Sequence, residues 1–315
     1  MSPARVLCVG ILVADVFVPP LERLPEAGEL IATDDFLLQP GGCAANTAIA
    51  LRTLGVEAAV CGRVGDDLLG SFVEQDLRSR GIDTSGVLRT DGYGTSKTVI
   101  MPVAGEDRRF VHTFGANAAL TAGDIDPAAF AAAEVLCVGG YLVLPSLRED
   151  GLADKLRAAR DHGTKVVLDV AVPAGAELSL DDAAAVLPFT DYFVPNEDEA
   201  FALTGEREPV RQAERFIERG ANCVAITLGD RGVYVRRGDW ELHVDAPPME
   251  VVEPSGAGDA FAAGLVVGIL EGWELERSVR FAAVVGASAC TALGCYAGVL
   301  TREQAEAFLA AHQGA

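Results

Sequence analysis

Three very small residues stand directly before an acid in Ser255-Gly256-Ala257-Gly258-Asp259, and an apolar, helix-forming run follows at once. Glycines let a backbone approach a ligand closely and adopt unusual dihedrals. The first turn of a helix carries free N–H groups and a partial positive charge. The stretch therefore predicts an anion site at a helix N-terminus, with the Asp259 carboxylate beside it as a base. Because Asp is also a favourable first-turn residue on local grounds, that simpler interpretation of Asp259 stays open.

A second group of small and polar residues lies in the N-terminal part of the chain. Gly41 and Gly42 open a predicted helix, and Asn46 lies about one turn inside it. An Asn side chain both donates and accepts hydrogen bonds, which suits the recognition of vicinal hydroxyls. Asp15 follows the first predicted strand and adds a carboxylate that can accept a hydrogen bond from a hydroxyl. A simple turn at Gly41-Gly42 is the alternative interpretation.

Two further clusters follow predicted strands in the C-terminal half. Asn196 and Glu199 lie three residues apart at a predicted helix start, where Glu199 could orient a hydrated Mg²⁺. The same spacing is typical of a capping box, which is the structural alternative. The segment Thr227-Leu-Gly229-Asp-Arg-Gly232 places a glycine-rich turn between two strands. The pattern predicts a β-hairpin, and Thr227 and Gly229 could also contact a nucleotide.

Several other catalytic and nucleotide motifs are excluded. None of the three lysines follows a Gly ahead of Ser or Thr, so the chain has no Walker A loop. The pair Gly256-Ala-Gly258 is followed by Asp-Ala-Phe, which does not fit a dinucleotide-binding fingerprint. No zinc-binding H-E-x-x-H motif and no nucleophile elbow occurs. A bound phosphate would therefore be held by backbone N–H groups, a metal ion and arginines such as Arg108 or Arg109.

Composition excludes some classes of partner. The formal net charge of -21 argues against a nucleic-acid partner, because phosphate backbones are bound by clustered Lys and Arg. The seven cysteines form no C-x-x-C pair and lie in apolar segments, which predicts free thiols in a cytoplasmic protein. The uncharged stretch Phe281–Leu300 has about the length of a membrane span. Since it consists mostly of Ala, Gly, Ser, Cys and Thr, we expect a buried helix and loop and no membrane partner.

Short apolar runs alternate with amphipathic stretches along most of the chain. We expect strands at residues 5–10, 58–65, 134–140, 165–172, 191–196, 223–229 and 232–237. Between them we expect helices at residues 44–54, 68–80, 147–162, 197–203, 209–219 and 259–271. Continuous apolar strands, each followed by a helix, indicate an α/β fold with a parallel sheet covered on both faces. Ligands bind such sheets beyond the carboxyl ends of the strands.

Two segments break this alternation, at residues 11–42 and 93–117. Both have period-two patterning and no helix between their strands. In the second, residues 96–103 and 108–114 flank Ala-Gly-Glu-Asp, which predicts a β-hairpin with its turn at residues 104–107. Together the two segments predict a small sheet set apart from the main layer, acting as a lid or an interaction surface. Because unpaired strand edges favour association, such a sheet would favour a homodimer through the lid.

The four clusters, in this order, resemble the ribokinase family, also called PfkB-type carbohydrate kinases. The N-terminal signature of that family is matched by GGCAANTAIALRTLG and GRVGDDLLG, and its C-terminal signature by GAGDAFAAG. Asn196 with Glu199, the TLGDRG loop and the FGANAAL segment match further elements. The resemblance runs from about Val6 to Gly298.

The resemblance implies a Rossmann-like three-layer α/β/α fold with a mostly parallel central sheet and a small β-sheet lid. Residues 1–315 would form a single kinase domain, with the lid as a subdomain formed by residues 11–42 and 93–117. The activity implied is transfer of the γ-phosphate of ATP to a hydroxymethyl group of a small sugar, in the presence of Mg²⁺.

The roles implied for single residues fall into four groups. Asp259 would be the base, and Gly256, Ala257 and Gly258 would offer N–H groups to the transferred phosphoryl. The acceptor hydroxyls would be held by Asp15, Gly41, Gly42 and Asn46. Glu199 would position Mg²⁺ through water, and the nucleotide would be bordered by Asn196, Thr227, Gly229 and Gly232.

One departure from the family pattern bears on a cofactor. Glu253-Pro254-Ser255 stands where the family usually has Asp-Thr-Thr, so activation by K⁺ stays open. A nucleoside kinase of the same fold and a non-catalytic sugar or nucleotide sensor are the alternative functions. Motif spacing does not determine the acceptor, because the discriminating side chains lie on the lid.

Overall fold

The computed structural model describes residues 4–104, 108–173 and 175–312. Within these residues, one sheet of nine strands has the order β13-β12-β11-β10-β9-β8-β1-β4-β5. All neighbouring pairs from β11 to β5 are parallel, while β12 and β13 are antiparallel additions at one edge. The strands are β1 (Val6–Gly10), β4 (Ala58–Gly65), β5 (Asp83–Thr90), β8 (Val135–Gly139), β9 (Lys165–Leu168), β10 (Tyr192–Phe193), β11 (Val224–Thr227), β12 (Val233–Arg237) and β13 (Trp240–Val244).

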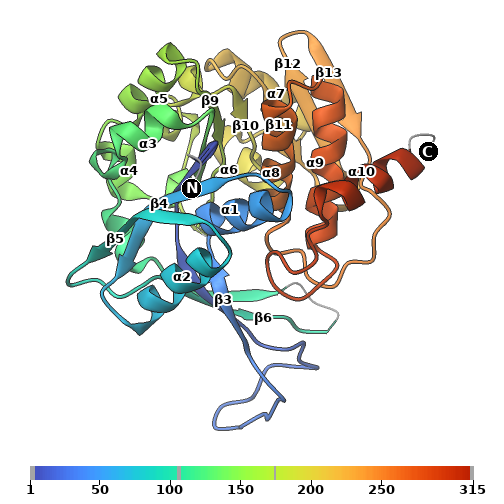
Figure 1. Ribbon diagram of the computed structural model, residues 1–315. Coiled ribbons are helices and arrows are strands. Elements are labelled where there is room, and N and C mark those ends of the chain that lie inside the picture. The colour runs from blue at the N-terminus through green and yellow to red at the C-terminus, as the bar shows by residue number, and fades with distance from the viewer. Residues whose placement is uncertain (1–3, 105–107, 174, 313–315) are drawn as a thin grey trace.

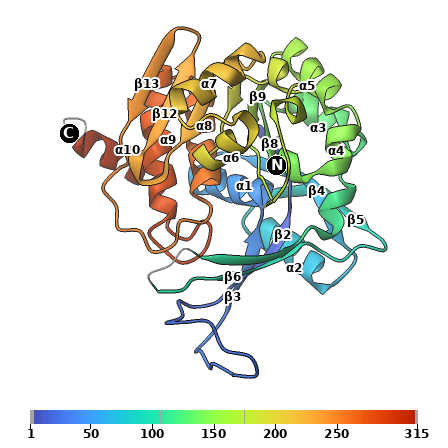
Figure 2. The ribbon, with the colours of Figure 1, turned by 180° about the vertical axis from the view of Figure 1, so that it is seen from behind.

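Two layers of helices cover this sheet, one on each face (Figures 1 and 2). The layer on one face comprises α1 (Cys43–Thr53), α2 (Leu68–Ser79), α8 (Ala257–Leu270), α9 (Leu275–Ala289) and α10 (Arg302–Ala311). The layer on the other comprises α3 (Pro127–Ala132), α4 (Pro145–Glu149), α5 (Leu152–Asp161), α6 (Glu197–Thr204) and α7 (Pro209–Glu218). Short 3₁₀ turns lie at Gly115–Ala119, Ala122–Asp124, Tyr141–Val143, Leu180–Asp182, Leu187–Phe189 and Gly229–Arg231.

The strand residues explain why both faces are covered. Along β1, Val6 and Cys8 pack into the cluster of one helix layer, and Leu7 and Val9 pack into the other. Every residue of β1 is buried. A strand that is apolar on both faces needs a layer on each side, so the predicted three-layer α/β/α fold with a mostly parallel sheet is confirmed.

A second, smaller sheet has the order β3-β2-β6-β7 and lies below the main layer in Figure 1. Its strands are β2 (Val13–Phe17), β3 (Leu37–Gly41), β6 (Lys97–Met101) and β7 (Arg109–Thr113). All four come from the two helix-free segments expected to form the lid, and β6 pairs with β7 antiparallel. Of the predicted hairpin turn, residues 105–107 lie outside the described residues. The assignment of the chain to one domain with a lid subdomain stays a prediction.

Some predicted boundaries are wrong. The helix expected at residues 147–162 is two helices, α4 and α5, because Gly151 adopts a left-handed φ of 78° and ends the first run. The strand expected at residues 165–172 ends at Leu168. Helix α8 begins at Ala257, two residues before the expected start, so Asp259 lies inside its first turn.

The uncharged stretch Phe281–Leu300 forms the end of α9 and the loop that follows it, as predicted. Across the described part of the chain, no helix has the length and apolar character needed to cross a membrane.

Candidate active site

The candidate residues gather where the parallel strands end. Asp169 follows β9, Asn196 follows β10, and Thr227 is the last residue of β11. Asn196 and Thr227 form an isolated parallel bridge, and the Thr227 N–H donates to the carbonyl of Pro195 at 3.0 Å. Because parallel strands place their carboxyl ends along one edge, residues distant in sequence meet there.

The stretch Gly256–Asp259 opens α8, a helix of 14 residues. Gly256 is its N-cap with a left-handed φ of 79°, and a Cβ there would lie 2.1 Å from the carbonyl oxygen of Cys295. A Cβ at Gly258 would meet nothing within 4 Å. Gly256 is therefore required by the backbone, whereas Gly258 leaves open space in front of the helix terminus. The Ala257 N–H makes a long bond of 3.4 Å to the carbonyl of Pro254.

Asp259 is held by Asn46, whose Nδ2 donates to its Oδ2 at 2.9 Å. Burial, with a smaller contribution from the negative charge of Asp15, raises the pKa of Asp259 to about 7, although hydrogen bonds from Asn46 and Cys43 act in the opposite direction. Asn46 itself is only 5% exposed. Within the described residues, its other amide atom, Oδ1, is buried and receives no hydrogen bond. An unpaired buried acceptor is costly, so this oxygen suits a donor from a ligand.

Two further carboxyl groups, those of Asp169 and Glu199, and the Cys43 thiol lie near Asp259. Atoms of Cys43, Asp169 and Asp259 that could bind a metal lie within 4.8 Å of one another. Burial and the charges of Glu199 and Asp259 raise the pKa of Asp169 well above its usual range. Burial also raises the pKa of Glu199 to about 7, with a contribution from Asp259. Converging carboxylates of this kind fit a hard divalent cation, whose charge would relieve their repulsion. Asp169 had no role in the sequence prediction.

Asn196 and Glu199 form the capping box of α6. The Glu199 N–H donates to Asn196 Oδ1 at 2.8 Å, and the Asn196 N–H donates to Glu199 Oε2 at 2.9 Å. The capping box, which the residue spacing indicated as the structural alternative, is therefore present. One Glu199 oxygen serves the cap, and the carboxylate still belongs to the cluster around Asp259.

The two glycines after β11 differ in their surroundings. A Cβ at Gly232 would lie 1.9 Å from the carbonyl of Val244, so this glycine is needed for the hairpin of β12 and β13. A Cβ at Gly229 would meet nothing within 4 Å, and Gly229 has a left-handed φ of 61°. The predicted β-hairpin from β11 to β12 is confirmed by their antiparallel register.

A large pocket of about 960 Å³ lies between the lid sheet and the strand ends, at the upper end of the range of small-molecule sites. Its lining includes Asp15, Gly42 and Ser255. Asp15 is 6% exposed, and burial raises its pKa to about 6. A Cβ at Gly41 would lie 1.8 Å from Asp15 Oδ2, so Gly41 makes room for that carboxylate. Gly42 borders the pocket at the N-cap of α1, with a φ of 87°.

A row of polar residues crosses the lid beside Asp15. The register pairs Asp15 with Gln39 on one side and with Thr98 on the other, and Thr98 pairs with His112. Thr98 Oγ1 lies 3.0 Å from His112 Nδ1, and both residues line the pocket. Burial lowers the pKa of His112, which favours the neutral ring. The sequence prediction did not include Gln39, Thr98 or His112, since only the pairing of the strands aligns them.

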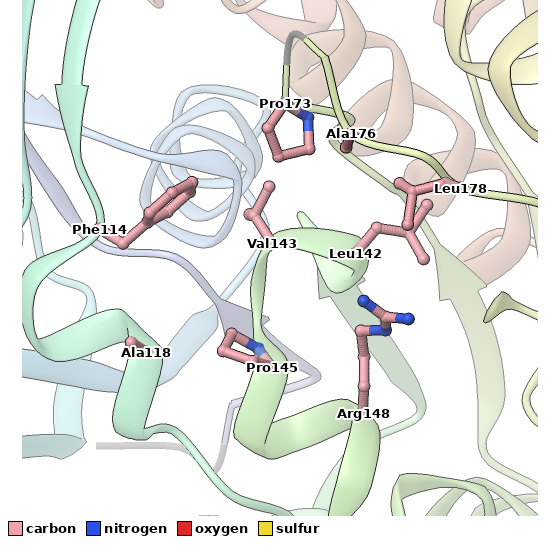
Figure 3. Close-up of a pocket in the computed structure, with 9 residues that line it drawn as sticks. All are labelled: Phe114, Ala118, Leu142, Val143, Pro145, Arg148, Pro173, Ala176 and Leu178. Carbon is pink, nitrogen blue, oxygen red and sulfur yellow. The ribbon is translucent and has the colours of Figure 1, made fainter.

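The two arginines of the lid, Arg108 and Arg109, have different neighbours. Arg109 lines the large pocket. Arg108 lies 3.2 Å from the Glu253 carboxylate, in the loop that leads to α8. A second hollow of about 270 Å³ adjoins the pocket and shares Phe114, Val143 and Pro173 with it. Figure 3 shows its apolar side chains, with Arg148 as the only charged group among its nine lining residues.

Known proteins resemble this chain over nearly its whole length. Residues 3–302 match the model of the pfkB family carbohydrate kinases. The chain is 28% identical to the ribokinase of Haemophilus influenzae over 90% of its own length and 91% of that protein. It is 29% identical to the 2-dehydro-3-deoxygluconokinase of Bacillus subtilis, covering 91% of this chain and 92% of that one.

A solved structure agrees with these relatives. The ribokinase of Arabidopsis thaliana complexed with ribose and ATP superposes with a TM-score of 0.82 at 25% identity, covering 98% of this chain and 99% of that one. The similarity expected from the signatures, and the enzyme class predicted with it, are confirmed. The chain belongs to the pfkB family of carbohydrate kinases.

Proposed function

We propose that the enzyme transfers the γ-phosphate of ATP to a hydroxymethyl group of a small sugar, with Asp259 as the base. The observation that carries this proposal is the position of Asp259, in the first turn of α8 and hydrogen-bonded to Asn46. A carboxyl group with a pKa of about 7 is ionised in a large fraction of molecules at neutral pH. It accepts the hydroxyl proton as the oxygen attacks the phosphorus, and a base is most effective with a pKa near the working pH.

The N-terminus of α8 would stabilise the charge on the transferred phosphoryl group. Gly256, Ala257 and Gly258 lie at the start of a long helix, where the helix dipole is positive, and would offer their N–H groups to this charge. The open space at Gly258 supports close approach of an oxyanion. Phosphoryl transfer depends on positioning and electrostatic stabilisation, which such a terminus supplies without a lysine.

The acceptor would lie between the lid and the start of α1. Asp15 and Asn46 Oδ1 would receive hydrogen bonds from its hydroxyls, and Gly41 and Gly42 keep space for them. Thr98 and His112 extend the same polar row and would contact a hydroxyl farther from the reacting one.

The nucleotide would lie along the ends of β10 and β11. Asn196, Thr227 and Gly229 would border it, and Gly232 would support the turn behind it. Glu199, through water, and Asp169 would hold Mg²⁺, because hard carboxylate oxygens suit that ion. When bound, Mg²⁺ would neutralise charge on the nucleotide phosphates. The seven free cysteines support a location in the reducing cytoplasm.

A nucleoside kinase is the second candidate, because one wall of the pocket is apolar and aromatic. Phe17, Phe110 and Phe114 line it, together with Val13 and Ile100. Phe110 is 52% exposed, a large uncovered area for an aromatic ring. Aromatic side chains of this kind suit a flat heterocycle next to the polar row. The intact Asp259 and glycine-rich terminus argue against a non-catalytic sensor.

The test is a screen of ADP release with Mg²⁺ and ATP over neutral sugars, sugar acids and nucleosides. Asp259→Asn should reduce turnover with the best acceptor by about 10²-fold or more, while ATP binding by calorimetry stays unchanged. Asp245→Asn, at a carboxylate 97% exposed, is the matched control and should keep normal turnover. Normal turnover in Asp259→Asn would contradict the assignment.

A further inference from the structure

Glu253 is a buried acid directly before the active-site helix. Its side chain is 2% exposed, in the loop between β13 and α8. A carboxylate in such a place is destabilising unless a cation and hydrogen bonds compensate it. The Ser255 N–H donates to Glu253 Oε1 at 2.8 Å, and the backbone N–H of Glu253 donates to the carbonyl of Cys290 at 3.0 Å. Glu253 thus shapes the two residues that precede Gly256.

The positive charge beside Glu253 comes from the lid. Arg108 stands immediately before β7, and its Nε lies 3.2 Å from Glu253 Oε1 and donates to Ser255 Oγ at 3.2 Å. The Arg108 side chain is 23% exposed, so water screens the pair only partly. Its guanidinium carbon also lies 5.3 Å from the centroid of the Phe110 ring, which lines the large pocket.

One side chain therefore contacts both halves of the site. Ser255 lies at the entrance to the anion-binding terminus of α8, and Phe110 forms part of the acceptor wall on β7. Arg108 and Ser255 are 147 residues apart in the sequence, and their contact joins the lid to the α8 loop. A charge pair that is nearly buried fixes geometry more strongly than an exposed one.

We propose that Arg108 is a positioning residue: its guanidinium is the built-in counter-cation of Glu253 and sets the lid and the α8 terminus in their working arrangement. This proposal rests on the proposed kinase function. Its consequence is that the Glu253 loop takes its positive charge from the lid and needs no dissolved monovalent cation. Loss of the guanidinium would leave a buried carboxylate that a small cation could neutralise.

The experiment compares wild type with Arg108→Lys, Arg108→Gln, Glu253→Gln and the double variant, in K⁺ and in tetramethylammonium at equal ionic strength. Wild-type kcat/KM should differ less than twofold between the two cations. Arg108→Gln should lose about 10- to 100-fold in kcat/KM, because displacing a reactant or catalytic group by even about 1 Å is costly. Added K⁺ or guanidinium should restore a large part of that loss, and Arg108→Lys should retain most activity.

The double variant shows whether the effect of losing Arg108 comes from the uncompensated charge of Glu253 or from the lost shape of the side chain. With Glu253→Gln added, no buried charge needs a cation, so rescue by K⁺ and guanidinium should disappear. Arg63→Gln is the matched control, since Arg63 makes a partly buried pair with Asp124 and neither residue lines the large pocket. It should lower stability without creating any dependence on K⁺.

Two results would overturn the proposal. One is wild-type turnover that requires K⁺, and the other is an Arg108→Gln variant that behaves like Arg63→Gln, with no cation rescue. The same comparison can be made without turnover, by the shift in melting temperature that K⁺ causes in each variant. If no acceptor is phosphorylated by wild type, the proposed function fails, while these melting temperatures still decide the role of Arg108.

Discussion

Asn46 donates from Nδ2 to Asp259 Oδ2 at 2.9 Å, a contact between helices α1 and α8 that spans 213 residues of sequence. The same amide leaves its Oδ1 buried and without a donor among the described residues. One side chain, Asn46, thus joins the proposed base to the side of the site that would receive the acceptor. The hydrogen bond also opposes the effect of burial on the pKa of Asp259.

The first prediction concerns the pH dependence of turnover. Because Asp259 must be ionised to accept a proton, kcat/KM should fall as the pH drops through about 7. Asn46→Ala removes a hydrogen bond that lowers the pKa of Asp259, so the acid limb should move to higher pH. The acceptor KM should also rise about tenfold. Asn222→Ala, at an exposed amide, is the control, and an unmoved acid limb in Asn46→Ala would contradict the prediction.

A second prediction concerns stability. Asp15, Glu199 and Asp259 have folded pKa values of about 6, 7 and 7, above their usual values near 4. For an acid with a raised pKa, the stabilising contribution is complete below the unfolded pKa and is lost as the pH rises through the folded one. The melting temperature of the metal-free protein should therefore fall from pH 5 to pH 8, and Mg²⁺ should stabilise more at pH 8.

Glu199→Gln tests the origin of that effect. Gln keeps the capping box but removes one charge from the cluster. The fall in melting temperature between pH 5 and pH 8 should become smaller, and the Mg²⁺ concentration needed for half-maximal activity should rise. Glu177→Gln, at an exposed position, should change neither quantity. An identical pH profile in Glu199→Gln and wild type would exclude the carboxylate cluster as the cause.

The third prediction separates the two glycines of the α8 terminus. Gly258→Ala adds a methyl group in open space and improves helix propensity by up to about 1 kcal/mol, so the protein should fold normally. Turnover should nevertheless fall by about tenfold or more, because the methyl group occupies the approach of the phosphoryl group. Gly256→Ala meets a carbonyl oxygen at 2.1 Å and needs a left-handed φ, so it should lower stability by about 1–3 kcal/mol. Equal losses of activity and stability in both variants would contradict this separation.

Local sequence patterns predicted the alternating strands and helices of the main sheet. The elements with weaker patterns depend on contacts between distant parts of the chain. The helices α1, α2, α6 and α7 follow from periodicity, and their ends agree within about two residues, whereas β9 and β10 are shorter than expected. Strand β5 and helix α10 carry weaker patterns and were not expected as separate elements, and of helix α9 only the part from Phe281 onward was expected. The break at Gly151 depends on a single left-handed residue inside an otherwise helical pattern.

For the candidate site, the sequence pattern indicated single residues but not how they contact one another. Asp259, Asn46 and Asp15 were predicted by residue type and spacing, but not their mutual contacts. The polar row of Gln39, Thr98 and His112 exists only because four lid strands pair in one register. Position 253 appeared in the sequence only as a departure from the family pattern, and its partner, Arg108, lies on another element. Local sequence therefore predicts neither the polar row of the lid nor the pair of Arg108 and Glu253.

The last prediction concerns the homodimer through the lid. Leu38, Val16, Val99 and Val111 lie in one register across the four lid strands, on the face opposite Asp15. Val111 is 62% exposed and Leu38 is 42% exposed, so the row presents aliphatic surface to solvent. We expect a second copy of the chain to cover it, because such a patch on an open sheet favours association.

Val111→Asp should convert the dimer to a monomer in light scattering coupled to gel filtration, because it places a charge in the centre of an apolar contact. Val210→Asp, on the exposed side of α7, is the matched control and should leave the mass unchanged. Val111 also lines the large pocket. The KM for the acceptor should therefore be measured for the same variant as the molecular mass. A monomeric wild type at micromolar concentration, or an unchanged mass in Val111→Asp, would exclude this surface as a dimer contact.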